Sequence, residues 1–462
     1  MLNTLNDVLN NVDNFIWGMP LIILILFTGI LLTVRLRGLQ IRHLGKALHY
    51  VFHNEDDGEG EVTSFGALCT ALSATIGTGN IVGCATAIVA GGPGALFWMW
   101  LAAFFGMATK YAEGMLAVKY RVIAEDGHTL GGPFYYIEKG MGKNFKWLAK
   151  LFCVFGTMVG LFGIGTFTQV NGITSAVNNF FDPSNVHTIS LFGMNYSISV
   201  VVAGIIVTIC AGLVIIGGIK RISKVSEVIV PFMAVTYIGV CLIIVFTHLP
   251  QVPAAFAEIV QSAFGLKAVA GIARGIFSNE AGLGSAPIAA AAAQTNEPVR
   301  QGLVSMTGTF IDTIIVCTMT GLAIVMTGAW DMGLEGVAVT TKAFALGLPF
   351  PAKASAFVLM MCLVFFAFTT ILGWAYYSER CLEYLVNGKK FVITAFKWFY
   401  ILAVFIGPFM TVSAVWTIAD ICNGLMAFPN LVALLALNGD VVSETRGYLE
   451  RVGIVKTTVG EA

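Results

Sequence analysis

The 462-residue sequence has few charged residues. Asp, Glu, Lys and Arg make up 11% of the chain, whereas 57% of it is hydrophobic. An ordinary soluble domain has about 25% charged residues. This lack of charge excludes a typical soluble domain and predicts a polytopic membrane protein built from α-helices. The net charge is zero, so the composition indicates no nucleic acid partner.

Residue patterns typical of enzymes and metal sites are also missing. The nine cysteines form no C-x-x-C pair, and the six histidines are scattered along the chain. No Ser/His/Asp set, H-E-x-x-H motif or pair of carboxylates indicates catalysis. We therefore expect a protein that is not an enzyme and has no cofactor.

Long apolar segments are abundant. A helix needs about 20 apolar residues to cross a hydrocarbon core of about 30 Å. The sequence predicts eleven such helices, at 16–35, 64–90, 94–120, 147–178, 196–218, 225–247, 268–293, 301–328, 355–377, 391–407 and 411–428.

The positions of Lys and Arg predict the orientation, because these residues remain on the cytoplasmic side. With eleven spans and the N-terminus outside, all but five of the 26 Lys and Arg fall in cytoplasmic segments. The exceptions are Lys267, Lys342 and Lys353 outside, and Lys110 and Arg274 within spans. We therefore expect a multi-pass plasma membrane protein with a cytoplasmic C-terminus.

Two spans are interrupted by glycine-rich polar stretches. They are "SATIGTGN" (73–80) in the second span and "FSNEAGLGSAP" (277–287) in the seventh. Paired breaks at corresponding places are typical of secondary transporters with inverted repeats. Close packing of small residues is the alternative. The predicted organisation is an N-terminal helix and cytoplasmic loop (1–62), two five-helix repeats made of spans 2–6 (63–248) and 7–11 (249–437), and a cytoplasmic tail (438–462).

Further motifs resemble those of a known family. "GGPGALFWMWLAAFFG" (91–106) resembles the signature of the alanine/glycine:cation symporters, also called sodium:alanine symporters, and "GTGNIVG" (77–83) and "GGPFYYIEKG" (131–140) agree with it. The resemblance implies the leucine-transporter fold and inward transport of alanine or glycine with sodium, or sometimes with protons. A proton-coupled amino-acid transporter remains an alternative, and a channel or a sensor is a further one.

The breaks predict how a small neutral amino acid binds. Backbone amides at a half-helix N-terminus attract a carboxylate, and carbonyls freed by a break accept hydrogen bonds from an ammonium group. Asn80 either supplements the site or holds the broken helix together, Gln169 either binds the amino group or bridges helices, and Trp374 either caps the side-chain pocket or packs in the core. The candidate substrate residues are Thr75, Gly77, Thr78, Gly79, Asn80, Gln169, Phe277, Ser278, Asn279 and Trp374.

A second group of residues is expected to hold the sodium ion. In the resembled fold the ion lies between the first broken helix and the third helix of the second repeat, which here carries Thr369 and Thr370. Carbonyls of Ser73, Ala74, Ile76 or Gly77 would complete the oxygen shell. Alternatively, both threonines bond to their own helix. Glu280 is an ionisable residue at membrane depth, so it is either functional or paired with Arg274.

Overall fold

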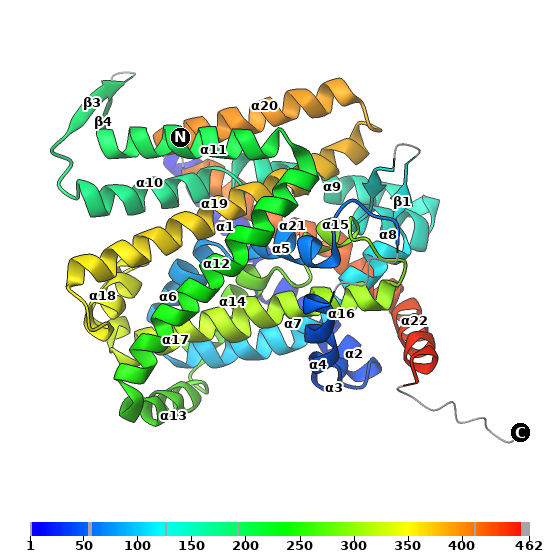
Figure 1. Ribbon diagram of the computed structural model, residues 1–462, viewed down its shortest axis with the longest axis horizontal. Helices are drawn as coiled ribbons and strands as arrows, with labels where there is room; N and C mark the ends of the chain where they lie inside the picture. Colours follow the sequence, from blue (N-terminus) through cyan, green and yellow to red (C-terminus); the bar gives the residue numbers. More distant parts are fainter. Residues whose placement is uncertain (1, 54–57, 125–126, 192–193, 411–412, 454–462) are drawn as a thin grey trace, which may run out of the picture.

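The computed structural model describes residues 2–53, 58–124, 127–191, 194–410 and 413–453. Most of them form helices packed side by side (Figure 1). The first part of the chain contains α1 (Leu2–Ile16), α2 (Met19–Arg35), α3 (Leu39–Arg42) and α4 (Leu44–Phe52). Residues 411 and 412, which begin the last predicted span, lie outside the described residues, as do 454–462 of the tail.

The first predicted repeat contains the first broken helix. Its elements are α5 (Ser64–Thr75), a π-helix (Gly79–Gly83), α6 (Cys84–Gly91), α7 (Gly94–Lys119), α8 (Pro133–Gly140), a 3₁₀ turn (Lys143–Phe145), α9 (Lys146–Phe162), α10 (Phe167–Phe181), α11 (Ile198–Ile215) and α12 (Gly218–Thr247). The axis bends by 53° between α5 and the Gly79–Gly91 helix.

The second predicted repeat contains the second break, between α14 and α15. Its α-helices are α13 (Val252–Ser262), α14 (Gly271–Asn279), α15 (Ala286–Ala290), α16 (Pro298–Thr309), α17 (Thr318–Met326), α18 (Val337–Gly347), α19 (Ala352–Leu385), α20 (Lys390–Ile406) and α21 (Ser413–Ala436). A π-helix (Phe310–Cys317) joins α16 to α17, and 3₁₀ turns lie at Leu249–Gln251, Leu266–Ala270, Ala329–Asp331 and Gly407–Phe409.

Two short hairpins are the strand pairs among the described residues. Strand β1 (Val122–Ile123) pairs antiparallel with β2 (Thr129–Leu130), and β3 (Thr188–Leu191) pairs antiparallel with β4 (Met194–Ser197). Both hairpins lie in connections between helices. The prediction of a helical membrane protein is therefore confirmed, with these small additions.

The number of membrane spans differs from the predicted eleven. Among the described residues, eight helices are long and apolar enough to cross a membrane. The number rises to ten if each of two bent pairs counts as one span, namely Ser64–Thr75 with Gly79–Gly91 and Leu249–Ser262 with Lys267–Asn279. Helix α7 matches the predicted span 94–120 but is not one of these helices, and almost all of its second half is buried. Such a helix packs against protein rather than lipid, so it can carry Lys110 and Glu113.

The predicted span 147–178 is interrupted between α9 and α10. The Tyr400 hydroxyl on α20 donates to the carbonyl oxygens of Gly165 and Ile371, at 2.7 and 2.9 Å. A Cβ at Gly165 would lie 2.6 Å from the Cβ of Trp374. The interruption therefore brings the backbone close to α19, which an uninterrupted helix with side chains would not allow.

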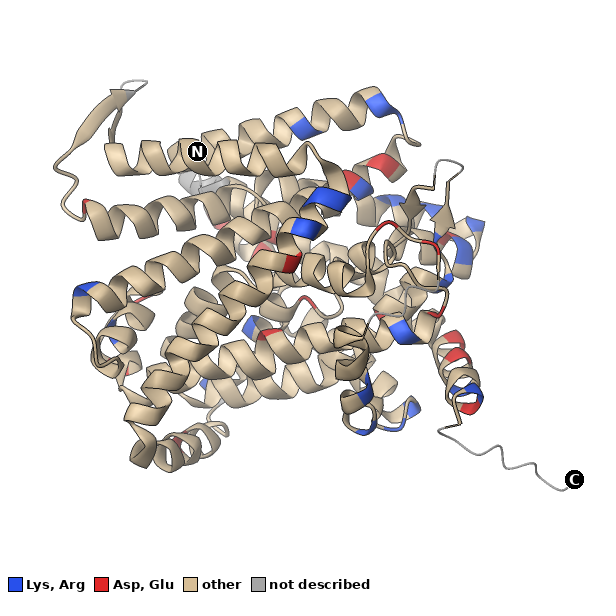
Figure 2. Ribbon diagram, viewed as in Figure 1, with Lys and Arg blue, Asp and Glu red and all other residues tan. Residues whose placement is uncertain are grey.

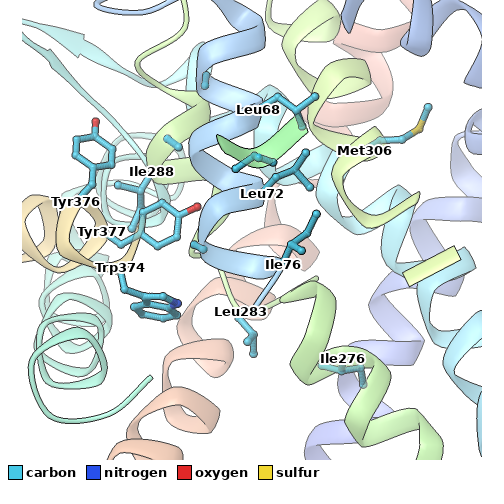
Figure 3. Close-up of a cluster of buried hydrophobic side chains, with 14 of the residues drawn as sticks. Leu68, Leu72, Ile76, Ile276, Leu283, Ile288, Met306, Trp374, Tyr376 and Tyr377 are labelled. Carbon is cyan, nitrogen blue, oxygen red and sulfur yellow. The ribbon is translucent and has the colours of Figure 1, made fainter. Parts of the chain in front are cut away.

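The core around the breaks is apolar and aromatic. Leu68, Leu72 and Ile76 follow one another at four-residue intervals along α5 and its end, so they lie on one side of the helix (Figure 3). Trp374 and Tyr377 of α19 lie close by and are at most 1% exposed (Figure 3). This packing fixes where α5 ends relative to α19.

The two ends of the bundle differ in charge. Lys and Arg gather at the end that carries α3, α8 and α22 (Asn438–Arg451), and few lie at the opposite end near α13 and α18 (Figure 2). Helix α22 forms the first part of the predicted cytoplasmic tail and packs against the bundle. The hydroxyl of Tyr448 lies 2.6 Å from that of Tyr50, and Thr445 Oγ1 lies 2.6 Å from the Tyr111 hydroxyl.

Candidate functional site

The first break is held open by a single side chain. Helix α5 ends at Thr75, and the Asn80 Oδ1 atom accepts a hydrogen bond from the Gly77 backbone N–H at 2.9 Å. Asn80 is fully buried. Its side chain replaces a helical hydrogen bond, which favours the role of holding the broken helix over direct contact with substrate. The Gly77 amide is therefore occupied and is not free to donate to a bound group.

A buried carboxylate ties the two breaks together. Asp312, in the π-helix after α16, accepts hydrogen bonds from Asn80 Nδ2 at 2.7 Å, from Ser278 Oγ at 2.9 Å and from Thr313 Oγ1 at 2.7 Å. Asn80 belongs to the first break and Ser278 to the last turn of α14, directly before the second. Asp312 therefore fixes the distance between the two broken helices.

Side chains from two other helices hydrogen-bond to the backbone of the second break. The Gly282 N–H donates to Glu113 Oε1 on α7 at 3.1 Å, and the Gly282 carbonyl accepts from Asn430 Nδ2 on α21 at 2.9 Å. Asn430 Nδ2 also donates to Glu113 Oε1 at 2.6 Å. The φ angle of Gly282 is +90°, a value that favours glycine. Both polar backbone groups of this unwound residue thus find partners inside the protein, as burial requires.

Glu280 is not paired with Arg274, contrary to one of the two predicted roles. Glu280 Oε2 accepts a hydrogen bond from Ser285 Oγ, and Glu280 Oε1 accepts one from Trp374 Nε1 at 3.2 Å. The buried Lys110 supplies positive charge in its surroundings. Arg274 lies a turn and a half earlier on α14 and is exposed. The break turns the chain after Asn279, so the two side chains point to different regions.

A chamber of about 40 Å³ lies between the two breaks. By the same measure a water molecule needs about 10–15 Å³, so the chamber suits a solute of a few heavy atoms. Its lining residues are Ala74, Thr75, Gly77, Thr78, Gly79, Ile164, Thr168, Gln169, Phe277, Ser278, Glu280 and Thr370.

The structure brings most of the predicted substrate residues to this chamber. Three of them do not line it: Asn80, Asn279 and Trp374. Asn279 Oδ1 accepts from the Ala281 N–H at 3.0 Å, and Trp374 is fully buried against Tyr377. The Asn279 side chain therefore stabilises the second break, and the Trp374 ring packs in the core.

Gln169 is the polar side chain of the chamber with unused bonding capacity. It lies on α10, just after the interruption at Gly163–Thr166, and it is 3% exposed. Among the described residues its Oε1 atom has no hydrogen-bond partner. A buried amide oxygen without a partner is unfavourable by about 1–3 kcal/mol, so this atom is suited to accept a hydrogen bond from a bound solute.

Of the predicted sodium ligands, Ala74, Gly77 and Thr370 line the chamber, whereas Ser73, Ile76 and Thr369 do not. The Thr370 hydroxyl donates to the Phe366 carbonyl at 2.9 Å, and the Thr369 hydroxyl donates to the same carbonyl at 3.0 Å. This is the bonding to their own helix that formed the alternative. A hydroxyl that donates in this way keeps lone pairs for a cation, and Thr370 Oγ1 lies close to Gly77.

A larger cavity of about 350 Å³ adjoins the chamber on the α14 side. It shares Thr78, Gly79, Ile164, Thr168 and Phe277 with the chamber, and it is also lined by Arg274, Trp416 and Asp420. The Phe277 ring also contacts Trp17 edge-on, with centroids 6.1 Å apart. We call this larger cavity the vestibule. Phe277 therefore lies between the chamber and the vestibule.

Sequence reasoning missed Asp312, Glu113 and Asn430. Asp312 and Glu113 are ionisable residues within apolar segments, and such residues are commonly functional. That signal was present in the sequence. Nothing in the sequence pattern, in contrast, indicates that Asn430 contacts Gly282, because the two residues are 148 positions apart.

Two helices broken at one enclosed chamber, in a bundle of apolar helices, define a secondary transporter. The solved structure of MhsT in complex with L-phenylalanine has the same fold: the TM-score is 0.59 at 12% identity, covering 84% of this chain and 93% of that one. The family described as the sodium:alanine symporter family matches residues 2–459, so the chain belongs to this family. It is therefore a multi-pass membrane transporter and not an enzyme.

Relatives in this family match nearly the whole chain. The sodium/alanine symporter AgcS of Methanococcus maripaludis is 45% identical over 96% of this chain and 97% of its own length. An uncharacterized transporter of Haemophilus influenzae is 54% identical over 98% of both chains. The probable sodium/glutamine symporter GlnT of Bacillus subtilis is 36% identical over 97% of this chain and 91% of its own.

Proposed function

We propose that the protein carries alanine, and also glycine, into the cell together with sodium. The unpartnered Gln169 Oε1 atom in a small chamber between two broken helices is the observation that carries this proposal. It is supported by the 45% identity to a sodium/alanine symporter along almost the whole chain. The predicted orientation, with the N-terminus outside, makes the vestibule of Arg274 and Asp420 the entry side.

The substrate has a defined place for each of its charged groups. Its carboxylate accepts hydrogen bonds from the backbone N–H groups of Thr78 and Gly79, because the N–H groups of Gly77 and Asn80 already donate to Asn80 Oδ1 and to the Gly77 carbonyl. Its ammonium group donates to Gln169 Oε1 and to the carbonyl oxygens of Phe277 and Ser278. The Phe277 ring limits the room beyond the α-carbon, so a methyl group fits better than a branched side chain.

Sodium binds between the first break and α19. Thr370 Oγ1 and carbonyl oxygens of Ala74 and Gly77 supply hard oxygen ligands, which suit a small cation. The ion and the substrate share residues of the first break, so each organises the backbone that the other binds. This shared backbone couples their transport.

Uptake into proteoliposomes tests the proposal. Purified protein should accumulate radiolabelled alanine against its gradient when sodium is imposed outside, and replacement of sodium by choline should abolish accumulation. Uncoupled flux that only equilibrates alanine would indicate a channel instead.

A proton-coupled transporter is the second candidate. Asp312 and Glu280 are carboxylates buried at the breaks, and Glu280 lines the chamber. Accumulation of alanine driven by a proton gradient in sodium-free buffer would favour this alternative. Accumulation that needs sodium at every pH would exclude it.

A further inference from the structure

Two apolar cavities flank helix α10, and neither shares a lining residue with the chamber. The larger one, of about 580 Å³, lies between α10, α11 and α19, and its apolar lining includes Ile173, Val177, Val202, Ile206, Val207 and Val364. The other, of about 490 Å³, lies between α10, α18 and α19, and its apolar lining includes Ala176, Ala356, Leu359, Met360 and Leu363. Phe181, the last residue of α10, lines both. The two cavities therefore adjoin at the end of α10.

Both cavities run inward from the same end of the bundle. This end, where α10 stops and α11, α18 and α19 begin, is opposite α8 and α22 (Figure 1). Along α19 the lining of one cavity extends from Lys353 to Leu363, which is about 15 Å at 1.5 Å per helical residue. Along α11 the lining of the other extends from Ile198 to Val207, which is about 14 Å. Half of a hydrocarbon core of about 30 Å has this length, so each cavity matches an acyl chain of one leaflet.

The cavities are accessible from the surface that the bundle presents to lipid. Helices α11 and α19 are both long and apolar enough to cross a membrane. Phe181, Val202 and Ile206 line the larger cavity and are about half exposed or more. An occupant can therefore enter from the bilayer without crossing the protein.

The mouth of the cavities favours a negatively charged group. Helices α11, α18 and α19 begin there, and among the described residues none of these three N-termini has a side-chain cap. Uncapped N–H groups and the positive end of the helix dipole attract anions. Lys353 adds a full positive charge, because it lines the mouth, is exposed, and forms no hydrogen bond or ion pair with a described residue.

The acidic side chain at this mouth is Asp182, and its oxygens are already engaged. Its Oδ1 atom accepts from the Val186 N–H at 2.9 Å. Its Oδ2 atom accepts from the His187 N–H and from Ser197 Oγ, each at 3.0 Å. These donors offset the charge of Asp182, so Lys353 and the helix N-termini are the groups that can meet a ligand.

We propose that the two cavities bind one phospholipid with an anionic headgroup, with an acyl chain in each cavity and the phosphate at Lys353. Under the predicted orientation the lipid belongs to the outer leaflet. It lies between α10, which carries Gln169, and α19, which carries Thr370. The bound lipid therefore stabilises the arrangement of the two helices that line the chamber, and its binding does not depend on which substrate is carried.

The test uses delipidated full-length protein in detergent. The probes are dioleoyl phosphatidylglycerol, which is anionic, and dioleoyl phosphatidylcholine, which has the same chains and no net charge. Native mass spectrometry counts the retained lipid, and thermal unfolding measures stabilisation. The wild type should retain a single phosphatidylglycerol molecule, which should raise its melting temperature by several degrees more than phosphatidylcholine does. Free glycerol phosphate, which lacks the chains, should have no effect.

Variants separate the headgroup from the chains. Lys353→Gln should reduce the stabilisation by phosphatidylglycerol to that by phosphatidylcholine, whereas Lys342→Gln, exposed on α18 and outside the cavity lining, should not. Ala356→Phe fills one cavity and Ala203→Phe fills the other. Each should lower the retention of both lipids severalfold, whereas Ala354→Phe, at an exposed position of α19 outside the lining, should leave it unchanged.

Equal stabilisation of the wild type by the two lipids, or full retention of phosphatidylglycerol in both cavity variants, would overturn the proposal. Stabilisation by free glycerol phosphate as large as that by the lipid would do the same, since the cavities would then hold no chains. Lys353 is exposed, so Lys353→Gln should fold even if a cavity variant does not, and an undiminished preference for phosphatidylglycerol in this variant also contradicts the site. These measurements need no alanine transport, so their outcome is separate from that of the proposed function.

Discussion

Asn80 Nδ2 lies 2.7 Å from Asp312 Oδ1, while the Oδ1 atom of the same asparagine accepts the Gly77 N–H. One buried amide therefore stabilises the unwound backbone of the first break and attaches it to Asp312, whose carboxylate also accepts a hydrogen bond from Ser278 of α14. The geometry of the substrate chamber depends on this pair, although neither side chain lines the chamber.

Replacing Asn80 with Ala should destabilise the protein and impair alanine binding together. The substitution leaves the Gly77 N–H without its acceptor and removes a donor from the buried Asp312, and each such loss is worth about 1–3 kcal/mol. Thermal unfolding in detergent and alanine binding on the same samples would measure both effects. Asn178→Ala is the control, because Asn178 bonds to Asn185 at the surface. Native stability of Asn80→Ala would contradict this role.

Removing the Thr370 hydroxyl should raise the sodium concentration needed for half-maximal uptake by about tenfold or more. Thr370→Val keeps the shape of the side chain and removes an oxygen that lines the chamber. Thr369→Val should have a smaller effect, because Thr369 does not line the chamber and bonds to Phe365 and Phe366 of its own helix. Sodium titrations of uptake decide between them, with Thr208→Val on α11 as a remote control. Equal sodium dependence in all three variants would remove Thr370 from the cation site.

The two glycines of the first break should respond differently to alanine substitution. A Cβ at Gly77 would lie 2.6 Å from Thr370 Oγ1, whereas a Cβ at Gly79 would have no heavy atom nearer than 3.8 Å. Gly77→Ala should therefore disturb the packing of α19 and lower the melting temperature. Gly79→Ala should fold normally and lose alanine affinity, since its methyl group enters the chamber. If Gly79→Ala bound alanine like the wild type, the carboxylate site would have to be placed elsewhere.

Phe277 should control the size of the accepted substrate. Its ring lines both the chamber and the vestibule, so Phe277→Ala should permit uptake of valine or leucine, which we expect the wild type to exclude. Competition of these amino acids against labelled alanine measures the change. Trp374→Ala provides the contrast: this buried ring does not line the chamber, and its removal should destabilise the protein by about 3–5 kcal/mol without widening specificity. Unchanged selectivity in a well-folded Phe277→Ala protein would show that the ring does not limit the site.

The local sequence predicted the elements of the site well. Apolar length identified the helices, and the glycine-rich stretches around Gly77 and Gly282 marked both breaks, because such residues weaken a helix wherever they occur. The motif at 91–106 indicated the family, which the family match then confirmed. These properties depend on residues adjacent in the chain, so they can be read without a structure.

The residues that hydrogen-bond to the two breaks depend on the tertiary structure. Asn80 meets Asp312 across 232 positions, and Gly282 meets Asn430 across 148. Glu280 faces Trp374 instead of Arg274 because the unwound segment turns the chain between them. By itself the sequence determined a helical membrane transporter with two breaks, since hydrophobic length and glycine placement are local. Which polar groups close each break, and which face the chamber, followed only from packing, because a buried backbone group bonds to whatever donor or acceptor the fold brings within reach.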